Sequence, residues 1–240
     1  WQIQPRLPTV QGALETVFAE IEKAPVHVAG SGRTDAGVHA LAQVAAVSIE
    51  NPIPLDNLRR ALNRLLPPSI RVLAVQETVP DFDARRDATS KTYEYRVFRH
   101  EICSPFERRY VHHHPYPLKE QAMFDAVGLF EGEHDFSAFA AADERDTLGR
   151  SKVRRIFRSE LVRKDDRLVY RVTGSGFLKH MVRNIVGTLL ETGKGNCHSD
   201  RLRWLLAAPP GVKAGPTAPA CGLFLVSVSY ESSDPAAFDI

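Results

Sequence analysis

The stretch Gly32-Arg33-Thr34-Asp35-Ala36-Gly37-Val38-His39-Ala40 decides how this chain is interpreted. It places the carboxylate of Asp35 on a loop flanked by glycines. Short segments at residues 26–29 and 43–49, in which apolar and other residues alternate, predict a strand on either side of that loop. An acid on a strand–loop–strand connection is presented to a ligand, whereas an acid inside a helix or strand mostly faces solvent. The arrangement therefore favours a chemical role for Asp35 over the alternative of a surface turn.

The glycines at positions 30 and 32 open a second alternative, a nucleotide-dependent enzyme. A glycine-rich turn after a strand lets the backbone approach a pyrophosphate at the start of a helix. Here Asp35 takes the place of the third glycine, and the segment that follows is strand-like rather than an amphipathic helix. No Gly-Lys-Ser or Gly-Lys-Thr follows, which excludes a Walker loop. A site at Gly30 and Gly32 is thus the weaker alternative.

The composition is that of an ordinary globular protein. The 240 residues include 43% hydrophobic and 25% charged residues, and this length allows one large domain or two smaller halves. No apolar run reaches the roughly 18 residues that a membrane span requires, and no secretory leader is visible. The three cysteines are widely spaced and form no Cys-x-x-Cys pair, which favours a reducing cytoplasm and disfavours a structural zinc.

A surface for a polyanion is predicted by where the basic residues lie, because the net charge of +2 is too small to indicate one. Local clusters neutralise several phosphates even when acids elsewhere balance the total charge. Solvated faces without a partner are the alternative. The clusters are Arg59, Arg60 and Arg64; Arg85, Arg86 and Lys91; and Arg150, Lys152, Arg154, Arg155 and Arg158.

The run His112-His113-His114 is the one group of residues that resembles a metal site. Adjacent side chains on a strand point to opposite faces, so at most His112 and His114 share a site. A stretch that faces solvent or RNA is the preferred interpretation, and we expect no metal.

Hydrophobic periodicity predicts two rounds of helices and strands. The first round has helices near 10–21 and 55–66, with strands at 70–79 and 91–98. The second round begins with a helix at 118–130, followed by a loop over 137–155 and strands at 153–162 and 168–173. It ends with a helix at 177–192, stopped by Gly193 and Gly195, and a strand at 222–228. We therefore expect an α/β fold of the α+β type, with two similar lobes around a central cleft. The lobes comprise residues 1–80, which carry the Asp35 loop, and residues 81–240.

The motif at 32–40 closely resembles the catalytic motif of the tRNA pseudouridine synthase A (TruA) family, whose aspartate maps onto Asp35. Further blocks resemble this family along nearly the whole chain. They are Phe82-Asp83-Ala84-Arg85 with Ala88, Lys91 and Tyr93-Glu94-Tyr95; His134-Asp135-Phe136; Phe177-Leu178 with His180-Met181-Val182-Arg183-Asn184-Ile185-Val186-Gly187; and Ala218-Pro219-Ala220 with Gly222-Leu223. The family's opening strand with its Tyr-Asp-Gly turn is absent, so we expect the first strand of the N-terminal lobe to be missing.

The resemblance implies the pseudouridine synthase fold, in which each lobe has a largely antiparallel sheet backed by helices. It also implies an isomerase that converts uridine to pseudouridine in the anticodon arm of tRNA, at positions thirty-eight to forty. The reaction is redox-neutral, so no cofactor is expected. The implied partners are tRNA and a second subunit of a homodimer. A catalytically silent RNA-binding module is the alternative, and the intact set Asp35, Tyr93 and Arg183 weighs against it.

The resemblance also assigns roles to individual residues. Asp35 acts as nucleophile or base, Tyr93 stacks on the target uracil, and Arg183 is the basic partner of the aspartate. Arg33 is the candidate to enter the space left by the flipped base. For His39, a structural histidine bonded to backbone is as plausible as an RNA contact. The implied substrate-binding residues are Arg33, Thr34, His39, Arg85 and Lys91.

Overall fold

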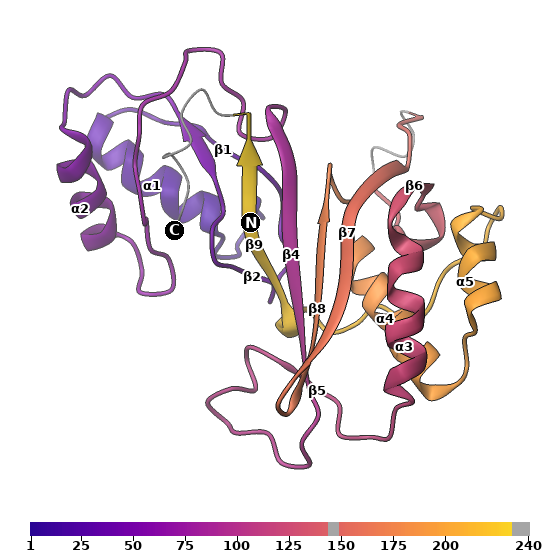
Figure 1. The fold of residues 1–240 in the computed structure, drawn as a ribbon. Helices are drawn as coiled ribbons and strands as arrows, with labels where there is room; N and C mark the ends of the chain where they lie inside the picture. Colours follow the sequence, from indigo (N-terminus) through magenta and orange to yellow (C-terminus); the bar gives the residue numbers. More distant parts are fainter. Residues whose placement is uncertain (144–148, 232–240) are drawn as a thin grey trace. The chain divides into compact units, whose positions relative to one another are not determined.

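The computed structural model describes residues 1–143 and 149–231, which belong to two compact units. Unit 1 comprises residues 1–36 and 43–88, and unit 2 comprises residues 37–42 and 89–240. Figure 1 shows the elements of each unit. The stretch 32–40 passes from unit 1 into unit 2, so the two halves of this motif have different surroundings.

Unit 1 holds the two helices predicted from the first apolar stripes, and both are confirmed. Helix α1 spans Val10–Glu22 and begins where the hydroxyl of Thr9 accepts a bond from the backbone N–H of Gly12 at 3.1 Å, and α2 spans Leu55–Leu65. The helices share a core with an antiparallel pair of strands, β1 (Val28–Gly30) and β3 (Ala45–Val47). The core residues are Leu14, Val17, Phe18, Val28, Leu58, Leu62 and Leu66.

The prediction of a strand at residues 70–79 is wrong, because no residue of this segment pairs with a neighbouring strand. Its apolar side chains Ile70, Val72 and Val75 do pack against the core of unit 1, which accounts for the alternating pattern. The backbone of Val72 is satisfied by the side chain of Asn63 instead, through bonds of 2.8 Å and 2.7 Å. A side-chain amide on α2 thus replaces the backbone hydrogen bonds that a neighbouring strand would supply.

Unit 2 is built on a seven-stranded mixed sheet in the order β2-β9-β4-β8-β7-β6, with β5 paired to β4. The pairs β4–β8, β8–β7 and β7–β6 are antiparallel, and the short pairs β2–β9 and β4–β5 are parallel. The predicted α/β fold class is therefore confirmed, with strands at each position expected in the second round. The strands are β2 His39–Ala40, β4 Ala88–Phe98, β5 His112–His113, β6 Gly132–Asp135, β7 Val153–Lys164, β8 Arg167–Gly174 and β9 Leu223–Tyr230.

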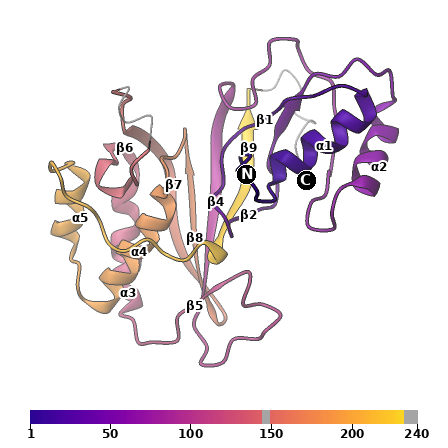
Figure 2. The ribbon, with the colours of Figure 1, turned by 180° about the vertical axis from the view of Figure 1, so that it is seen from behind.

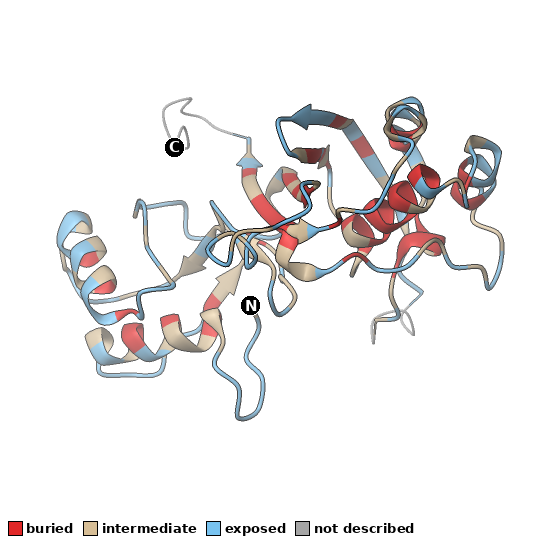
Figure 3. Ribbon diagram, turned by 90° about the horizontal axis from the view of Figure 1, so that it is seen from below, coloured by how far each residue is buried: buried red, intermediate tan, exposed pale blue. Residues whose placement is uncertain are grey.

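Helices α3 (Glu120–Val127) and α4 (Met181–Lys194) lie side by side next to the strands of this sheet, as both ribbon views show (Figures 1 and 2). Most of α4 is buried, including Ile185 and Leu189 (Figure 3). A further helix, α5, spans Ser199–Leu206, and one-turn 3₁₀ helices follow α3 at Gly128–Phe130 and lie at Ser137–Phe139 and Ala220–Gly222. No helix in the described ranges is long and apolar enough to cross a membrane.

Helix α4 begins four residues later than the pattern predicted. His180, directly before it, has a φ of 61°, in the left-handed region, which cannot belong to a right-handed helix. Gly195 ends the helix with a φ of 84°, as expected. Gly193 lies inside the helix, where a Cβ would come within 2.6 Å of the Met123 Sδ atom of α3, so close helix packing explains this glycine.

The loop predicted over 137–155 is interrupted by regular structure. The turn Ser137–Phe139 lies at its start, and β7 begins at Val153. Residues 144–148 of that prediction lie outside the described residues.

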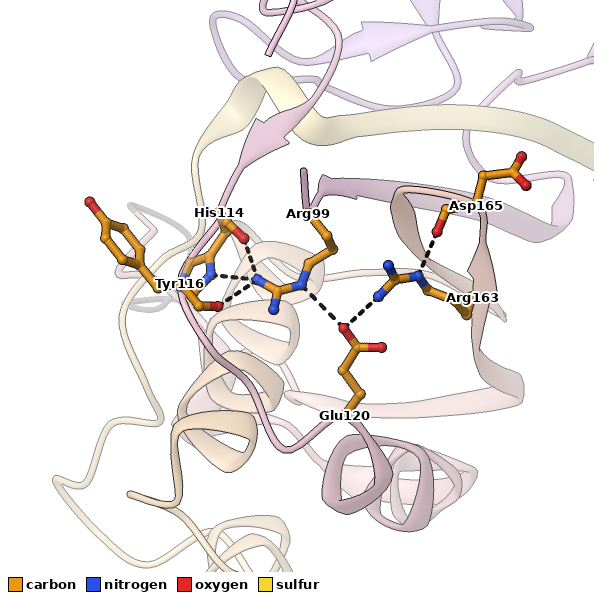
Figure 4. A network of polar contacts seen from close by, with 6 residues as sticks. All are labelled: Arg99, His114, Tyr116, Glu120, Arg163 and Asp165. Carbon is orange, nitrogen blue, oxygen red and sulfur yellow. Dashed lines mark hydrogen bonds and ion pairs between the residues drawn. The ribbon is translucent and has the colours of Figure 1, made fainter. Parts of the chain in front are cut away.

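A polar network joins β4, β5, α3 and the β7–β8 hairpin at one end of the sheet (Figure 4). Arg99, which follows β4, donates to Glu120 at 3.2 Å, to the Nδ1 atom of His114 at 3.1 Å and to the carbonyls of His114 and Tyr116. Arg163 of β7 donates to the same Glu120 oxygen at 2.6 Å. One carboxylate at the start of α3 thereby binds two arginines, one that follows β4 and one on β7.

Candidate active site

The loop that carries Asp35 is closed at its base by polar bonds within unit 1. The backbone N–H of the fully buried Ser31 donates to the carbonyl of Val44 at 2.8 Å, and its hydroxyl donates to Gln43 at 2.6 Å. Gln43 in turn donates to the carbonyl of Gly32 at 3.0 Å. These bonds fix the backbone at the start of the motif at residues 32–40. Asp35 itself is half-buried, which suits a group that is held in place but reaches a ligand.

The second half of the motif is anchored in unit 2 by His39. In β2, His39 lies opposite Phe224 of β9, and the two rings stack at 4.9 Å between centroids. The His39 Nε2 atom shares a 2.8 Å hydrogen bond with the carbonyl of Arg109, and the ring also contacts Tyr110 at 5.0 Å. These contacts are those of the structural alternative for His39, a ring bonded to backbone. Gly37, at the turn before β2, has a φ of 81° that a glycine adopts without strain.

The nucleotide-binding alternative for Gly30 and Gly32 conflicts with this geometry. Gly30 belongs to β1, and a Cβ on it would lie 2.5 Å from the indole ring of Trp1. The missing side chain therefore makes room for packing within the protein. A phosphate cradle also needs a helix that starts at the loop. Here the loop leads to β2 and β3, and the next helix begins at Leu55.

Tyr93 of β4 lies on the buried face of the sheet. Tyr93, Tyr95 and Val97 alternate along β4 and so point to the same side, and they are 9%, 0% and 3% exposed. The Tyr93 ring meets Phe177 edge to face at 5.1 Å. Burial raises the pKa of Tyr95, and its hydroxyl donates to the carbonyl of Pro219 at 2.8 Å. The Tyr93 ring thus packs edge-on against Phe177 from the middle of β4.

Arg183 lies in the first turn of α4, off the buried stripe of that helix, as expected from its position in the sequence. Its Nε atom donates to the carbonyl of Ala218 at 2.7 Å, and the backbone N–H of Ala218 donates to the Arg183 carbonyl at 3.1 Å. The positive charge of Arg183 also acts on Tyr95, where it favours ionisation and opposes the effect of burial on that pKa. The guanidinium is therefore held by the chain that follows α5.

The other predicted substrate-binding residues lie in different surroundings. Arg33 is exposed and Thr34 is half-buried, both beside Asp35. Arg85 is exposed on a tight turn, where its backbone N–H donates to Asp83 at 2.8 Å. Lys91 is half-buried on β4.

Unit 1 contributes Arg33, Thr34, Asp35 and Arg85, and unit 2 contributes His39, Lys91, Tyr93 and Arg183. The approach of Asp35 to the tyrosine and to Arg183 stays a prediction. The predicted site residues are therefore divided between unit 1 and unit 2.

Two of the three basic clusters lie on exposed faces of regular elements. Arg60 and Arg64 are exposed on α2, and Arg155 is exposed on β7. The cluster on β7 is not uniform. Arg158 forms an ion pair with Glu160 at 2.7 Å, whereas Arg154 donates to backbone carbonyls and has a pKa lowered by burial. On β7, Arg155 is therefore better placed for a phosphate than Arg154 or Arg158.

His112 is half-buried, and its ring contacts two neighbouring side chains. Its ring lies edge-on to Tyr95 at 6.2 Å and to His114 at 5.8 Å. Burial, followed by repulsion from His114, lowers the pKa of His112 to about 4. Across residues 1–143 and 149–231, no group of three or more His, Cys, Asp or Glu side chains is placed to hold a metal ion.

The sequence analysis missed the contacts that hold Arg183 in place. Ala218 bonds to Arg183 directly, Thr217 bonds to Asn184, and Gly187 faces the backbone of Pro216. Arg183 and Ala218 stand in two separate blocks of the resemblance, and nothing in their spacing showed that these blocks touch. A glycine in the interior of an otherwise apolar helix, as at Gly187, is the one signal of a close approach.

A family model described as tRNA pseudouridine synthase matches residues 2–86 and 126–231. The chain belongs to this family.

Curated relatives share most of their length with the chain. A tRNA pseudouridine synthase A of Solibacter usitatus is 64% identical over 230 residues, which cover 96% of this chain and 93% of the relative. Proteins of the same description from Myxococcus xanthus and Bacillus pumilus are 43% identical over 239 residues and 42% identical over 234 residues. The first of these alignments covers 98% of the chain and 88% of the relative, and the second covers 97% and 94%.

Proposed function

We propose that this protein isomerises uridine to pseudouridine in the anticodon arm of tRNA, at positions thirty-eight to forty. The observation that carries the proposal is Asp35, which lies half-buried on a loop whose base is fixed by Ser31 and Gln43. The names of the relatives and the match of the family model support the same substrate class.

The reaction breaks the bond between uracil N1 and the ribose C1′, turns the base, and forms a bond from C5 to the same carbon. The C5 proton is lost and a proton returns to N1, so no electrons are exchanged with a cofactor. The base must leave its stack to reach Asp35, at a cost of a few kcal/mol that RNA contacts must offset. Weakly paired uridines in a loop lower this cost.

In this proposal Asp35 acts as nucleophile or base. As a nucleophile it attacks C1′ or C6 of the uridine; as a base it removes a proton from the sugar to give a glycal. Both routes require an ionised carboxylate, and a pocket that expels water favours the protonated form. The guanidinium of Arg183 opposes this effect, because it stays charged and its planar fork grips a carboxylate in one orientation.

The remaining side chains bind and orient the base. Tyr93 stacks on the uracil, and its fixed contact with Phe177 supports a rigid platform. Arg33, exposed beside Asp35, enters the space that the flipped base leaves in the RNA. Thr34, His39, Arg85 and Lys91 complete the binding set in this proposal.

The proposed partners are tRNA and a second copy of the chain, with the exposed arginines of α2 and β7 as phosphate contacts. We propose two lobes, residues 1–80 and 81–240, as the parts that enclose the RNA. The cytoplasm is the proposed site of action, which the free thiols of Cys103, Cys197 and Cys221 support.

The test is the substitution Asp35→Asn, assayed on tRNA transcripts that carry tritium at C5 of uridine. Wild-type protein should release tritium from the anticodon arm, since the C5 proton is lost. An amide keeps the shape of the carboxylate but is neither a competent nucleophile nor a base. We expect turnover below about one hundredth of wild type, a loss of more than about 2.7 kcal/mol in transition-state stabilisation. The affinity for tRNA should change little.

Two outcomes contradict the proposal. If wild-type protein binds tRNA but releases no tritium, the alternative of a silent RNA-binding module is correct. If Asp35→Asn keeps more than about one hundredth of the turnover, the catalytic carboxylate lies elsewhere.

A further inference from the structure

Residues 214–219, here called the strap, run directly across the N-terminal half of α4 on the way from α5 to β9 (Figure 2). A Cβ added at Gly187 would lie 1.6 Å from the carbonyl oxygen of Pro216, whereas ordinary contact begins at 3.4 Å. A Cβ at Gly215 would meet the backbone of Thr188 at 3.0 Å. Two glycines, one on each segment, therefore let the backbones touch.

The strap is joined to α4 by a series of hydrogen bonds that ends at Arg183. The backbone N–H of Gly215 donates to the Thr188 hydroxyl at 3.0 Å, and the Thr217 hydroxyl donates to the Asn184 side chain at 2.6 Å. The N–H of Ala218 donates to the Arg183 carbonyl at 3.1 Å, and the Arg183 Nε atom donates to the Ala218 carbonyl at 2.7 Å. Each of these donors has its acceptor on the other segment.

Both ends of this arrangement are fixed by the core of unit 2. Asn184 is 8% exposed, and its amide nitrogen donates to the carbonyl of Phe139 at 2.6 Å. Ala218 is buried, and the carbonyl of Pro219 next to it accepts from the hydroxyl of the fully buried Tyr95. The Ala218 carbonyl is therefore held in one place on both sides of the strap, by α4 and by β4.

The bond to Nε determines how the guanidinium of Arg183 is oriented. The Nε–H lies in the plane of the guanidinium, so a fixed acceptor sets the position of Nε and the direction in which that edge of the guanidinium points. An unrestrained arginine side chain has about 2 kcal/mol of rotamer entropy to lose when it grips a carboxylate. A strap that has already fixed the plane reduces this loss, and misplacement of a reacting group by about 1 Å costs up to about a hundredfold in rate.

We propose that the strap positions Arg183 for the reaction, and that Gly187 and Thr217 are positioning residues. This inference rests on the proposed function, in which Arg183 pairs with the catalytic carboxylate. Neither positioning residue needs to contact RNA, because each acts through the placement of the Ala218 carbonyl.

The test uses two substitutions that disturb the strap in different ways. Gly187→Ala forces the backbone at Pro216 to move, and we expect single-turnover rates to fall by at least about tenfold. Thr217→Val keeps the shape of the side chain but removes the bond to Asn184, so a smaller fall of severalfold is expected. The Kd for tRNA should stay within about twofold for both. Gly128→Ala is the matched control, since nothing lies within 4 Å of its added Cβ.

Arg183→Met distinguishes positioning from a general loss of folding. In the Arg183→Met background neither strap substitution should reduce the rate further, because the group that the strap positions is gone. Losses that multiply in the double variants would overturn the inference, since they would show an effect that does not pass through Arg183. If Gly187→Ala does not fold, Thr217→Val and its double variant decide the question alone.

The result also separates this inference from the function on which it rests. If the wild type is active and the folded strap variants react within about twofold of it, only the proposed role of the strap is overturned. A wild type that makes no pseudouridine overturns both the proposed function and the role of the strap within it.

Discussion

Replacing Glu120 by alanine should destabilise unit 2 more than the loss of an exposed ion pair would. The side chain of Arg99 is 9% exposed and that of Glu120 is 22% exposed, so the pair is largely shielded from water. Glu120→Ala leaves Arg99 without its carboxylate and also removes the acceptor of Arg163 (Figure 4). The substitution thus breaks two charge-assisted bonds at the start of α3.

The size of the effect follows from what remains around Arg99. Removal of one partner from a fully buried pair costs about 3–5 kcal/mol, because a buried charge is left uncompensated. Arg99 keeps the Nδ1 atom of His114 and the carbonyls of His114 and Tyr116 as acceptors, which reduces the penalty. We expect a loss of about 2 kcal/mol, which for a chain of this length lowers Tm by about 4–8 °C.

Urea unfolding of the full chain measures this loss. The two tryptophans lie in different units, so a Trp1→Phe background leaves Trp204 as the reporter of unit 2. Asp200→Ala is the matched control, because Asp200 is also an acid in the first turn of a helix with an arginine partner, Arg203, but is 99% exposed. A free-energy loss for Glu120→Ala below about 0.5 kcal/mol, or equal to that of the control, would refute the reasoning.

Two further predictions concern pH and salt. The pKa of His112 falls from 6.5 to about 4 on folding, so the unfolded chain takes up a proton first and the free energy of unfolding should decrease as the pH drops from about 6.5 to about 4. Urea titrations across this range should show a shallower decrease for His112→Asn; an unchanged slope would contradict the assignment. Affinity for tRNA should fall steeply with salt, and Arg155→Glu should flatten the log–log slope without slowing single turnover, whereas an unaltered slope would mean that Arg155 faces only solvent.

Most regular elements could be predicted from the sequence, because their signals are local. The apolar stripes of α1 and α2 and the alternation in β4, β7 and β8 lie within short windows. The two exceptions depended on a contact with a distant residue and on the backbone conformation of one residue. The strand predicted at 70–79 failed because Asn63 takes the place of a neighbouring strand, and α4 began late because His180 adopts a left-handed conformation.

The residues of the candidate site could be proposed from the sequence, whereas the contacts that hold them could not. Asp35, Tyr93 and Arg183 stand in motifs that resemble a known family, and that membership is confirmed. The motif around Asp35 gave no indication that its two halves belong to different units. Nor did it show that His39 is held by the carbonyl of Arg109, 70 positions further along the chain.

The sequence by itself thus determined most of the helices and strands, which carboxylate is the candidate for chemistry, and to which family the chain belongs. Only the tertiary structure decided what holds the reactive groups in place. The contact of Gly187 with Pro216, and the bond from Arg183 to Ala218, join segments about 30 residues apart with α5 between them. Periodicity and turn chemistry describe how a segment folds against its near neighbours along the chain. Which distant surfaces then meet depends on the packing of the whole unit, and no local pattern records it.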